Sequence, residues 1–329
     1  MGAVDNQLNK DLGTRALALY CLAMVLTLLM YSAQADEGGV AFWLSGQYAS
    51  LAAVPPSPGW SLPTSLYYYS GRSQPETIYD FGESLVVGQT SQETMLLLTP
   101  TYALQTKWFG GQPSFGLGIG YGMNRVQADY TLSATGSEQY RQDNDSGLTD
   151  IAPIVSLAWS HGVHNTMVYL TGNIPVGSYD SQRLANIGIG HAALDAGGGY
   201  TYLNALSGLE FSVVAGFTYN FENQNTDYQN GIDSHLGWGV SLFLGSSWEL
   251  GVVGYVYYQL TADGGSGDSV GAFKSRVAAI GPQIGYTFNV GGQTWNANLR
   301  GYYEFCAENR PEGYALFLTL GIPLGGKTR

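Results

Sequence analysis

The sequence predicts an all-β protein, a transmembrane antiparallel up-and-down β-barrel. The clearest sign is the stretch 314–324, where apolar side chains occupy every second position from Tyr314 to Leu324. Such alternation is typical of a strand with two different faces. The pattern returns along the chain in segments of about ten residues, the length that a membrane-spanning strand needs. Because the chain also begins with an export signal, the pattern indicates a barrel of the bacterial outer membrane.

Residues 1–35 carry the three parts of a secretory signal peptide. Lys10 and Arg15 precede an apolar run over residues 16–30, and small residues follow up to Ala35. A charged start, an apolar middle and a small-residue cleavage site favour export and removal of this segment. A membrane anchor fits less well, because the run is short for a spanning helix. We therefore expect the protein in the outer membrane of a Gram-negative bacterium.

Charge and cysteine content exclude several classes of protein. The formal net charge is −12, and loss of residues 1–35 leaves it unchanged, because two basic and two acidic residues leave together. This acidity argues against nucleic-acid binding. Cys21 lies in the signal, so Cys306 remains alone and the fold cannot depend on an intrachain disulfide. No later run reaches about eighteen apolar residues, so no transmembrane helix is predicted.

Alternation predicts twelve spans, an even number, as bacterial barrels have. They cover residues 59–70, 93–107, 113–130, 148–160, 166–177, 191–203, 208–224, 234–245, 248–262, 275–289, 294–306 and 313–324.

The connections between these spans alternate in length. The short ones fall at residues 109–112, 161–165, 204–207, 246–247 and 290–293. The long ones fall at residues 71–92, 131–147, 178–190, 225–233, 263–274 and 307–312. We expect short turns on the periplasmic rim and long loops on the extracellular rim of one barrel domain, residues 59–329.

Parity within each span sorts the side chains into a lipid face and a lumen face. In the span 208–224, Leu209 and Phe217 point outward, whereas Glu210 and Thr218 point inward. A water-soluble sandwich would also alternate, but it would enclose its apolar face. Together with the export signal and the strand length, the pattern favours the membrane barrel.

Residues 36–58 do not alternate and form a segment of their own. They contain Phe42, Trp43, Tyr48 and three prolines. The segment is either a plug folded into the lumen or a periplasmic tail. We favour the plug, because several aromatic side chains are costly to leave in water.

Several separated blocks of the mature chain are similar to one known family. They are Gly38-Gly39-Val40-Ala41-Phe42-Trp43-Leu44, Gly198-Gly199-Tyr200-Thr201-Tyr202-Leu203, Asn220-Phe221-Glu222-Asn223, Ile280-Gly281-Pro282-Gln283 and Glu304-Phe305. Through these blocks the chain resembles the outer-membrane transporters named for the meta-pathway of phenol degradation. Residues 71–92 and 131–147 match least. The resemblance implies a barrel associated with uptake of aromatic or other hydrophobic compounds, without supplying a catalytic set.

One pair of inward residues is a candidate gate. If the loop between the seventh and eighth spans centres near Tyr228, Glu222 lies opposite His235 and both face the lumen. A carboxylate beside an imidazole favours the protonated histidine. The pair is either a polar gate near the outer mouth or, more simply, a structural contact that stiffens the hairpin.

Other inward candidates are acids, an arginine and tyrosines. Arg300 and Glu304 share a face but lie about 13 Å apart along the strand, too far for a direct bond. With Glu210, they can anchor a plug or line a water path, and anchoring is the simpler role. The rings of Tyr255, Tyr257 and Tyr302 either form a track for an aromatic or acyl solute or simply fill a narrow barrel.

The sequence predicts no enzyme, metal or cofactor. No His/Cys/Asp spacing suggests a metal site, and no glycine-rich loop opens a helix to hold phosphate. A lipid hydrolase needs a serine activated by histidine, yet Ser241 and His235 are several residues apart.

The expected function is passive uptake of small hydrophobic or aromatic compounds through the outer membrane. Its partners would be outer-membrane lipid and the solute, with no nucleic acid. The rivals are a general porin-like channel with an acidic lumen, an outer-membrane lipid hydrolase and a structural or adhesive barrel.

Overall fold

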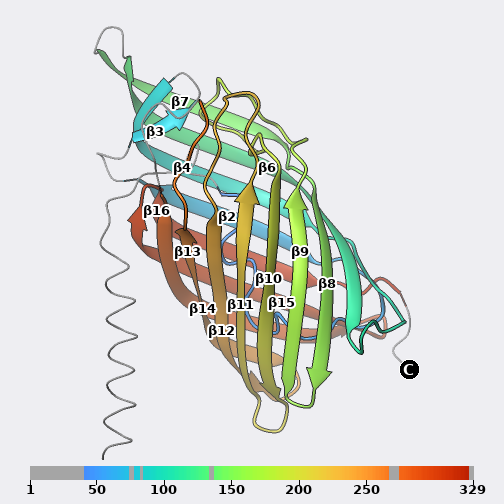
Figure 1. Cartoon of the computed structure of the whole chain (residues 1–329). Coiled ribbons are helices and arrows are strands. Elements are labelled where there is room, and N and C mark those ends of the chain that lie inside the picture. Colours follow the sequence, from blue (N-terminus) through green and yellow to red (C-terminus); the bar gives the residue numbers. More distant parts are fainter. Residues whose placement is uncertain (1–40, 74–77, 82–83, 133–136, 267–273, 326–329) are drawn as a thin grey trace, which may run out of the picture. The chain divides into compact units, whose positions relative to one another are not determined.

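A computed structural model describes residues 41–73, 78–81, 84–132, 137–266 and 274–325. The predicted signal peptide, residues 1–35, lies outside these ranges. Within them no helix is long and apolar enough to cross a membrane. The described chain is built from antiparallel strands (Figure 1).

The strands, in chain order, are β1 (Gly59–Ser61), β2 (Thr64–Arg72), β3 (Ile78–Phe81), β4 (Ser84–Leu98), β5 (Thr101–Ala103), β6 (Gln112–Leu132), β7 (Ser137–Leu148), β8 (Ala152–His161), β9 (His164–Asn173), β10 (Ala193–Asn204), β11 (Leu209–Asn220), β12 (Asp233–Leu244), β13 (Trp248–Gln259), β14 (Arg276–Val290), β15 (Gln293–Glu308) and β16 (Glu312–Gly321).

Twelve of these strands close into a barrel in the order β6-β8-β9-β10-β11-β12-β13-β14-β15-β16-β2-β4. The ring closes where β16 pairs with β2, with Leu316 opposite Tyr68, and where β4 pairs with β6, with Leu98 opposite Ile119. Closure leaves no unpaired edge in the ring, as a sheet in hydrocarbon requires. The predicted twelve-stranded up-and-down barrel is confirmed.

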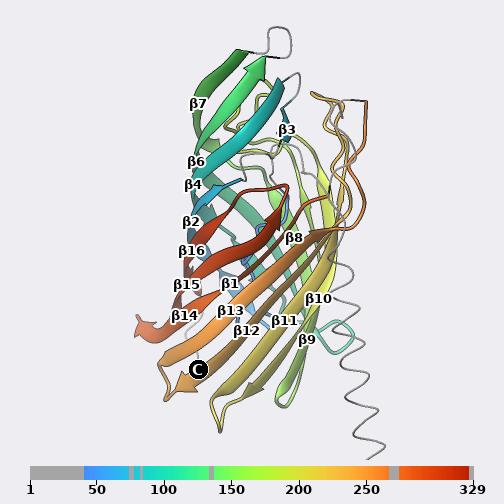
Figure 2. The same cartoon turned by 90° about the vertical axis from the view of Figure 1, so that its left-hand side faces the viewer.

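The wall is taller on one side than the prediction implied. Residues 131–147, expected as a loop, lie largely in strand. β6 continues to Leu132, and β7 pairs over its whole length with the second half of β6. The first part of β6 pairs instead with β8, from Gln112 opposite Ala158. The β6–β7 hairpin and the β3–β4 hairpin therefore extend beyond the ring (Figure 2).

The two rims differ in the length of their connections, as predicted. At one rim β14 and β15 are joined through Gly291 and Gly292, and both have positive φ. A two-residue turn with positive φ at both positions matches the twist of the flanking strands. At the opposite rim the connections are long, notably residues 174–192, 221–232 and 260–275.

The outer face of the wall is apolar and the inner face polar. In β11, Leu209 and Phe217 are exposed, whereas Glu210, Ser212 and Thr218 are fully buried. Val252 and Leu318 on other strands are exposed as well. Apolar side chains on the outside of a closed sheet are typical of a barrel in lipid. The predicted alternation of faces is confirmed.

Residues 41–58 lie inside the barrel and are here called the inner segment. The segment is irregular apart from short turns, in which Gln47 N donates to Leu44 O (3.1 Å) and Val54 N to Leu51 O (3.0 Å). Its far end leads into β1, which pairs with β5 at the short-turn rim. In Figures 1 and 2 it is the dark blue trace within the wall.

Candidate functional site in the barrel lumen

Wall side chains hold the half of the inner segment that lies near the short-turn rim. Leu51 N donates to Glu210 Oε1 (2.9 Å), and Ala53 N donates to Thr201 Oγ1 (3.0 Å). Ser50 Oγ lies 2.9 Å from Ser241 Oγ. A buried backbone group needs a hydrogen-bond partner, and an irregular segment cannot supply one from its own secondary structure. Inward polar residues of the strands supply those partners.

Arg300 and Tyr302 hold the middle of the inner segment. Arg300 Nε donates to Gly46 O (3.1 Å) and Arg300 Nη2 donates to Gln47 O (3.0 Å). Tyr302 OH donates to the same Gly46 carbonyl (3.1 Å). The Arg300 guanidinium also lies 4.6 Å over the ring of Phe317. Its planar, forked donors suit two adjacent carbonyl oxygens.

An aromatic stack on His235 holds the start of the inner segment. The Trp43 and His235 rings lie 3.4 Å apart between centroids, with 11° between their planes. His235 Nε2 lies 3.0 Å from Asp195 Oδ2 and 3.2 Å from Tyr169 OH. Tyr48 also stacks on Trp43, with ring centroids 5.6 Å apart. Burial, with a smaller effect of Asp195, raises the pKa of Tyr48 to about 12.

The predicted Glu222–His235 pair is wrong. β11 ends at Asn220 and β12 begins at Asp233, and the register places Gly216 opposite His235. Glu222 lies in the connecting loop and is exposed. The hairpin does not centre on Tyr228, which is buried and donates to Asp263 (2.6 Å). The carboxylate at His235 comes instead from Asp195 on β10.

Glu304 and two of the candidate tyrosines belong to hydrogen-bond networks. Glu304 accepts from Tyr255 OH (2.6 Å), Tyr69 OH (2.9 Å) and Gly313 N (2.9 Å). Tyr257 OH donates to Asp233 Oδ1 (2.6 Å). The hydroxyls of both tyrosines are therefore held by carboxylates of the wall.

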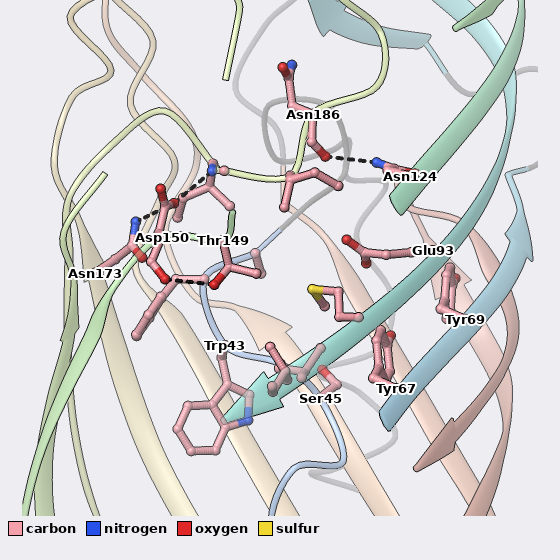
Figure 3. A pocket seen from close by; sticks show the side chains of 18 of the residues that line it. Trp43, Ser45, Tyr67, Tyr69, Glu93, Asn124, Thr149, Asp150, Asn173 and Asn186 are labelled. Atoms are coloured by element: carbon pink, nitrogen blue, oxygen red, sulfur yellow. Dashed lines mark hydrogen bonds between the residues drawn. The ribbon is translucent and has the colours of Figure 1, made fainter. Parts of the chain in front are cut away.

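A cavity of about 310 Å³ lies in the lumen against the inner segment (Figure 3). Residues 41–48 of the inner segment contribute to its lining, together with strands β2, β4, β6 and β9 and loop 174–192. Much of the surface is apolar or aromatic, including Trp43, Tyr67, Met95, Leu97, Val126, Ile154, Leu184 and Ile187. Of the predicted site residues, Tyr255 and Glu304 line this lumen cavity, whereas Glu210, Glu222, His235, Tyr257, Arg300 and Tyr302 do not.

Loop 174–192 is held over the cavity by hydrogen bonds to the wall. Asp150 accepts from Gly177 N (2.8 Å), Ile189 N (2.9 Å) and Asn173 Nδ2 (2.9 Å). On the facing strand, Asn124 Nδ2 donates to Asn186 O (3.0 Å). The long loop is therefore part of the site rather than a detached surface element.

Arg310 lines the cavity from the β15–β16 connection. Burial by itself lowers the pKa of Arg310, but Glu304 together with Tyr257, Tyr69 and Tyr255 outweighs burial, so the pKa is raised and the guanidinium stays charged. It lies 4.8 Å over the Tyr257 ring. In the described ranges no group of three or more His, Cys, Asp or Glu residues is placed to hold a metal ion.

The chain is similar to known proteins in sequence and in fold. The sequence matches the family described as "Putative MetA-pathway of phenol degradation" over residues 76–320. The chain belongs to this family. The resemblance predicted from the sequence is confirmed, whereas a search of curated proteins finds no match.

Solved structures of outer-membrane proteins are similar to this chain. An outer membrane channel from Pseudomonas putida F1 is similar with a TM-score of 0.58 and 14% identity, covering 86% of this chain and 100% of that chain. At that identity the likeness shows the fold alone. Two further structures have lower TM-scores. A FadL homologue of Pseudomonas aeruginosa has a TM-score of 0.42 and 9% identity, covering 81% of this chain and 90% of that chain. The transport unit of the autotransporter AIDA-I from Escherichia coli has a TM-score of 0.44 and 13% identity, covering 87% of this chain and 94% of that chain.

Most residues that line the cavity of this family member are not among the predicted site residues, and Glu93 is the one acidic side chain among them that bears no hydrogen bond from a described residue. Glu93 on β4 contributes to the lining together with Met95 and Leu97. The signal was present, because positions 93, 95 and 97 share one parity in the predicted span 93–107. What the sequence does not reveal is that an inner segment and a loop would enclose this part of the lumen.

Proposed function

We propose that this protein is an outer-membrane channel for passive uptake of small hydrophobic or aromatic compounds. One observation carries the proposal: the barrel holds a largely apolar cavity beside an inner segment that runs through its lumen. An aqueous bore needs neither feature. A solute that leaves water for an apolar pocket gains free energy from burial, at roughly 25 cal/mol per Å².

The lining of the cavity suits an aromatic body. Trp43, Tyr67 and Tyr69 present rings to it, and Met95 and Leu97 present flexible apolar side chains. Pockets of this kind, mainly apolar with a few polar groups, bind small organic ligands. A sugar of similar size would meet apolar side chains over much of this surface, where its hydrogen bonds to water are not replaced.

In this proposal residues 36–58 form a plug and residues 59–329 form the barrel. The inner segment would leave or rearrange to let the solute pass, with Glu210, Arg300 and Tyr302 as its anchors. Tyr255 and Glu304 belong to the cavity wall. The Trp43–His235 stack is the contact that holds the inner segment next to the cavity. Glu222, which is exposed in a loop, has no part in this gate.

The proposed orientation places short turns in the periplasm and long loops outside the cell. β1 and the end of β16 both lie at the short-turn rim, since Ser61 bridges Pro323. Export by a cleaved signal peptide, residues 1–35, would deliver the chain to the periplasm. Solute would then meet loop 174–192 first, and the cavity next.

The rival functions fit the geometry less well. A general porin needs a continuous water path, whereas the inner segment is hydrogen-bonded across the lumen. A lipid hydrolase needs an activated serine, whereas Ser241 bonds Glu249 Oε1 (2.9 Å) and Ser50. His235 bonds Asp195 and Tyr169 rather than a serine.

Uptake into proteoliposomes tests the proposal. The full mature chain should raise uptake of a phenyl compound far more than uptake of a sugar of similar size. A Met95→Gln variant, which places an amide in the cavity, should reduce the aromatic uptake several-fold. The matched control Ser207→Gln, in an exposed turn, should leave it unchanged. Equal uptake of both solutes would instead favour the porin.

A further inference from the structure

One acidic side chain of the cavity lacks a partner. Among the described residues, no hydrogen bond or ion pair reaches the Glu93 carboxylate, although it lines the cavity. The other two cavity acids are fully bonded: Asp150 by loop 174–192 and Asn173, and Glu304 by two tyrosines and Gly313 N. Figure 3 shows Glu93 extending into the cavity from the wall that also carries Tyr67 and Tyr69. Glu93 is therefore free to meet a solute.

The cations of the cavity do not pair with Glu93. Arg183 pairs with Asp145 (3.0 Å) and Asp180 (3.7 Å). Arg310 lies over the Tyr257 ring, and its Nε and Nη1 have no hydrogen-bond partner among the described residues. No described Lys or Arg comes within the 4.0 Å of Glu93 that defines an ion pair. A carboxylate with reduced access to water and no cation is costly, and a cationic ligand removes that cost.

The surroundings of Glu93 also favour a positively charged donor. Gln89, on the same face of β4, has a buried Oε1 with no hydrogen-bond partner among the described residues. Tyr69 lies directly across the strand pair from Glu93, and Tyr67 lies opposite Met95. Faces of aromatic rings attract cations, and ammonium groups are often bound between aromatic rings and a carboxylate. The β4 wall thus offers acceptors and rings together.

We propose that the lumen cavity selects solutes that join an aromatic or apolar body to an amine head, with Glu93 binding the ammonium group. This inference rests on the proposed channel function and names its solute class. The apolar lining takes the body of the solute, and the free carboxylate takes its charge. Glu93 becomes a specificity residue that distinguishes an amine from a neutral or anionic compound of the same shape.

Calorimetric titration of the detergent-solubilised mature protein tests this with three probes of one shape: 2-phenylethylamine, 2-phenylethanol and phenylacetate. We expect the amine to bind roughly tenfold more tightly than the alcohol, the difference between a charge-assisted and a neutral hydrogen bond. Phenylacetate should bind most weakly. Glu93→Gln should bring the amine to the affinity of the alcohol and change the alcohol little. The control Glu222→Gln, in an exposed loop, should change none of the three.

The possible results separate this inference from the channel proposal. Equal affinities for amine and alcohol, or an amine affinity that survives Glu93→Gln in a variant with an unchanged circular dichroism spectrum, would overturn it. Tightest binding of phenylacetate would overturn it too, by making Arg310 the dominant group. Absence of binding by all three probes would do the same. If aromatic uptake into proteoliposomes persists in any of these cases, the channel proposal stands without the amine preference.

Discussion

At the scale of single residues, the polar side chains of the lumen act mainly as partners for a segment without secondary structure. Arg300, Glu210 and Thr201 each bond backbone atoms of the inner segment. Such groups are buried, so each lost bond leaves an unsatisfied carbonyl or N–H behind. This explains why the inward polar residues of the strands are so well bonded.

Removal of the Arg300 side chain should loosen the inner segment. Arg300→Ala leaves the Gly46 and Gln47 carbonyls without their charged donor, a cost of about 1–3 kcal/mol. We expect more frequent opening events in planar-bilayer current recordings, and a lower free energy of unfolding. Arg125→Ala is the matched control, because Arg125 is exposed and its one bonded partner among the described residues is Gln142. Equal opening frequencies in both variants would show that Arg300 does not restrain the segment.

At this scale the alternation of faces predicts which side chains are buried. It does not predict which residues pair across strands, because that depends on the strand register. Glu210, Tyr255, Tyr302 and Glu304 are buried as the alternation predicts. Glu222 is misplaced, because its position depends on where the loop between β11 and β12 turns, and Gly216 rather than Glu222 lies opposite His235. One shifted turn changes every cross-strand pair beyond it.

At the scale of elements, closure of the barrel does not depend on the inner segment. All twelve ring strands pair with their neighbours through the wall, and β16 pairs with β2 without any help from residues 41–58. The segment contributes side-chain stacking and hydrogen bonds to the lumen, but no ladder to the ring. It can therefore move while the wall stays intact.

Deletion of residues 36–54 should open the lumen. Because β1 and all ring strands remain, the variant should keep its strand content in circular dichroism. We expect a several-fold rise in single-channel conductance and uptake of a sugar that the full mature chain excludes. Unchanged conductance in a folded variant would mean that the segment does not obstruct the passage.

The elements themselves are predicted well where alternation is uninterrupted. Each of the twelve predicted spans corresponds to a ring strand, because the membrane imposes one period on all of them. The stretches 71–92 and 131–147, both expected as loops, are missed. β3 and the first part of β4 lie in 71–92, and the end of β6 and most of β7 lie in 131–147. The cavity is missed for a different reason, since it depends on chain segments that are distant in sequence and meet only in the folded barrel.

At the scale of the whole molecule, the barrel combines a lipid-facing wall with an interior that is filled rather than open. In the proposed function, the wall faces lipid, the inner segment obstructs the lumen, and the cavity gives a solute a place to bind. Passive transport then requires movement of the inner segment. The channel and its obstruction are two parts of one proposal, and a test of the movement is a test of both.

A reversible tether between Ser50 and Ser241 tests this most directly. Their Oγ atoms lie 2.9 Å apart, so cysteines at the two positions bring their thiols together for oxidation. In a Cys306→Ser background, S50C/S241C should lose most uptake of a phenyl compound on oxidation and regain it on reduction. Uptake by each single variant should not change on oxidation. Full uptake by the completely cross-linked protein would contradict the account, because the solute would then pass a segment that cannot leave.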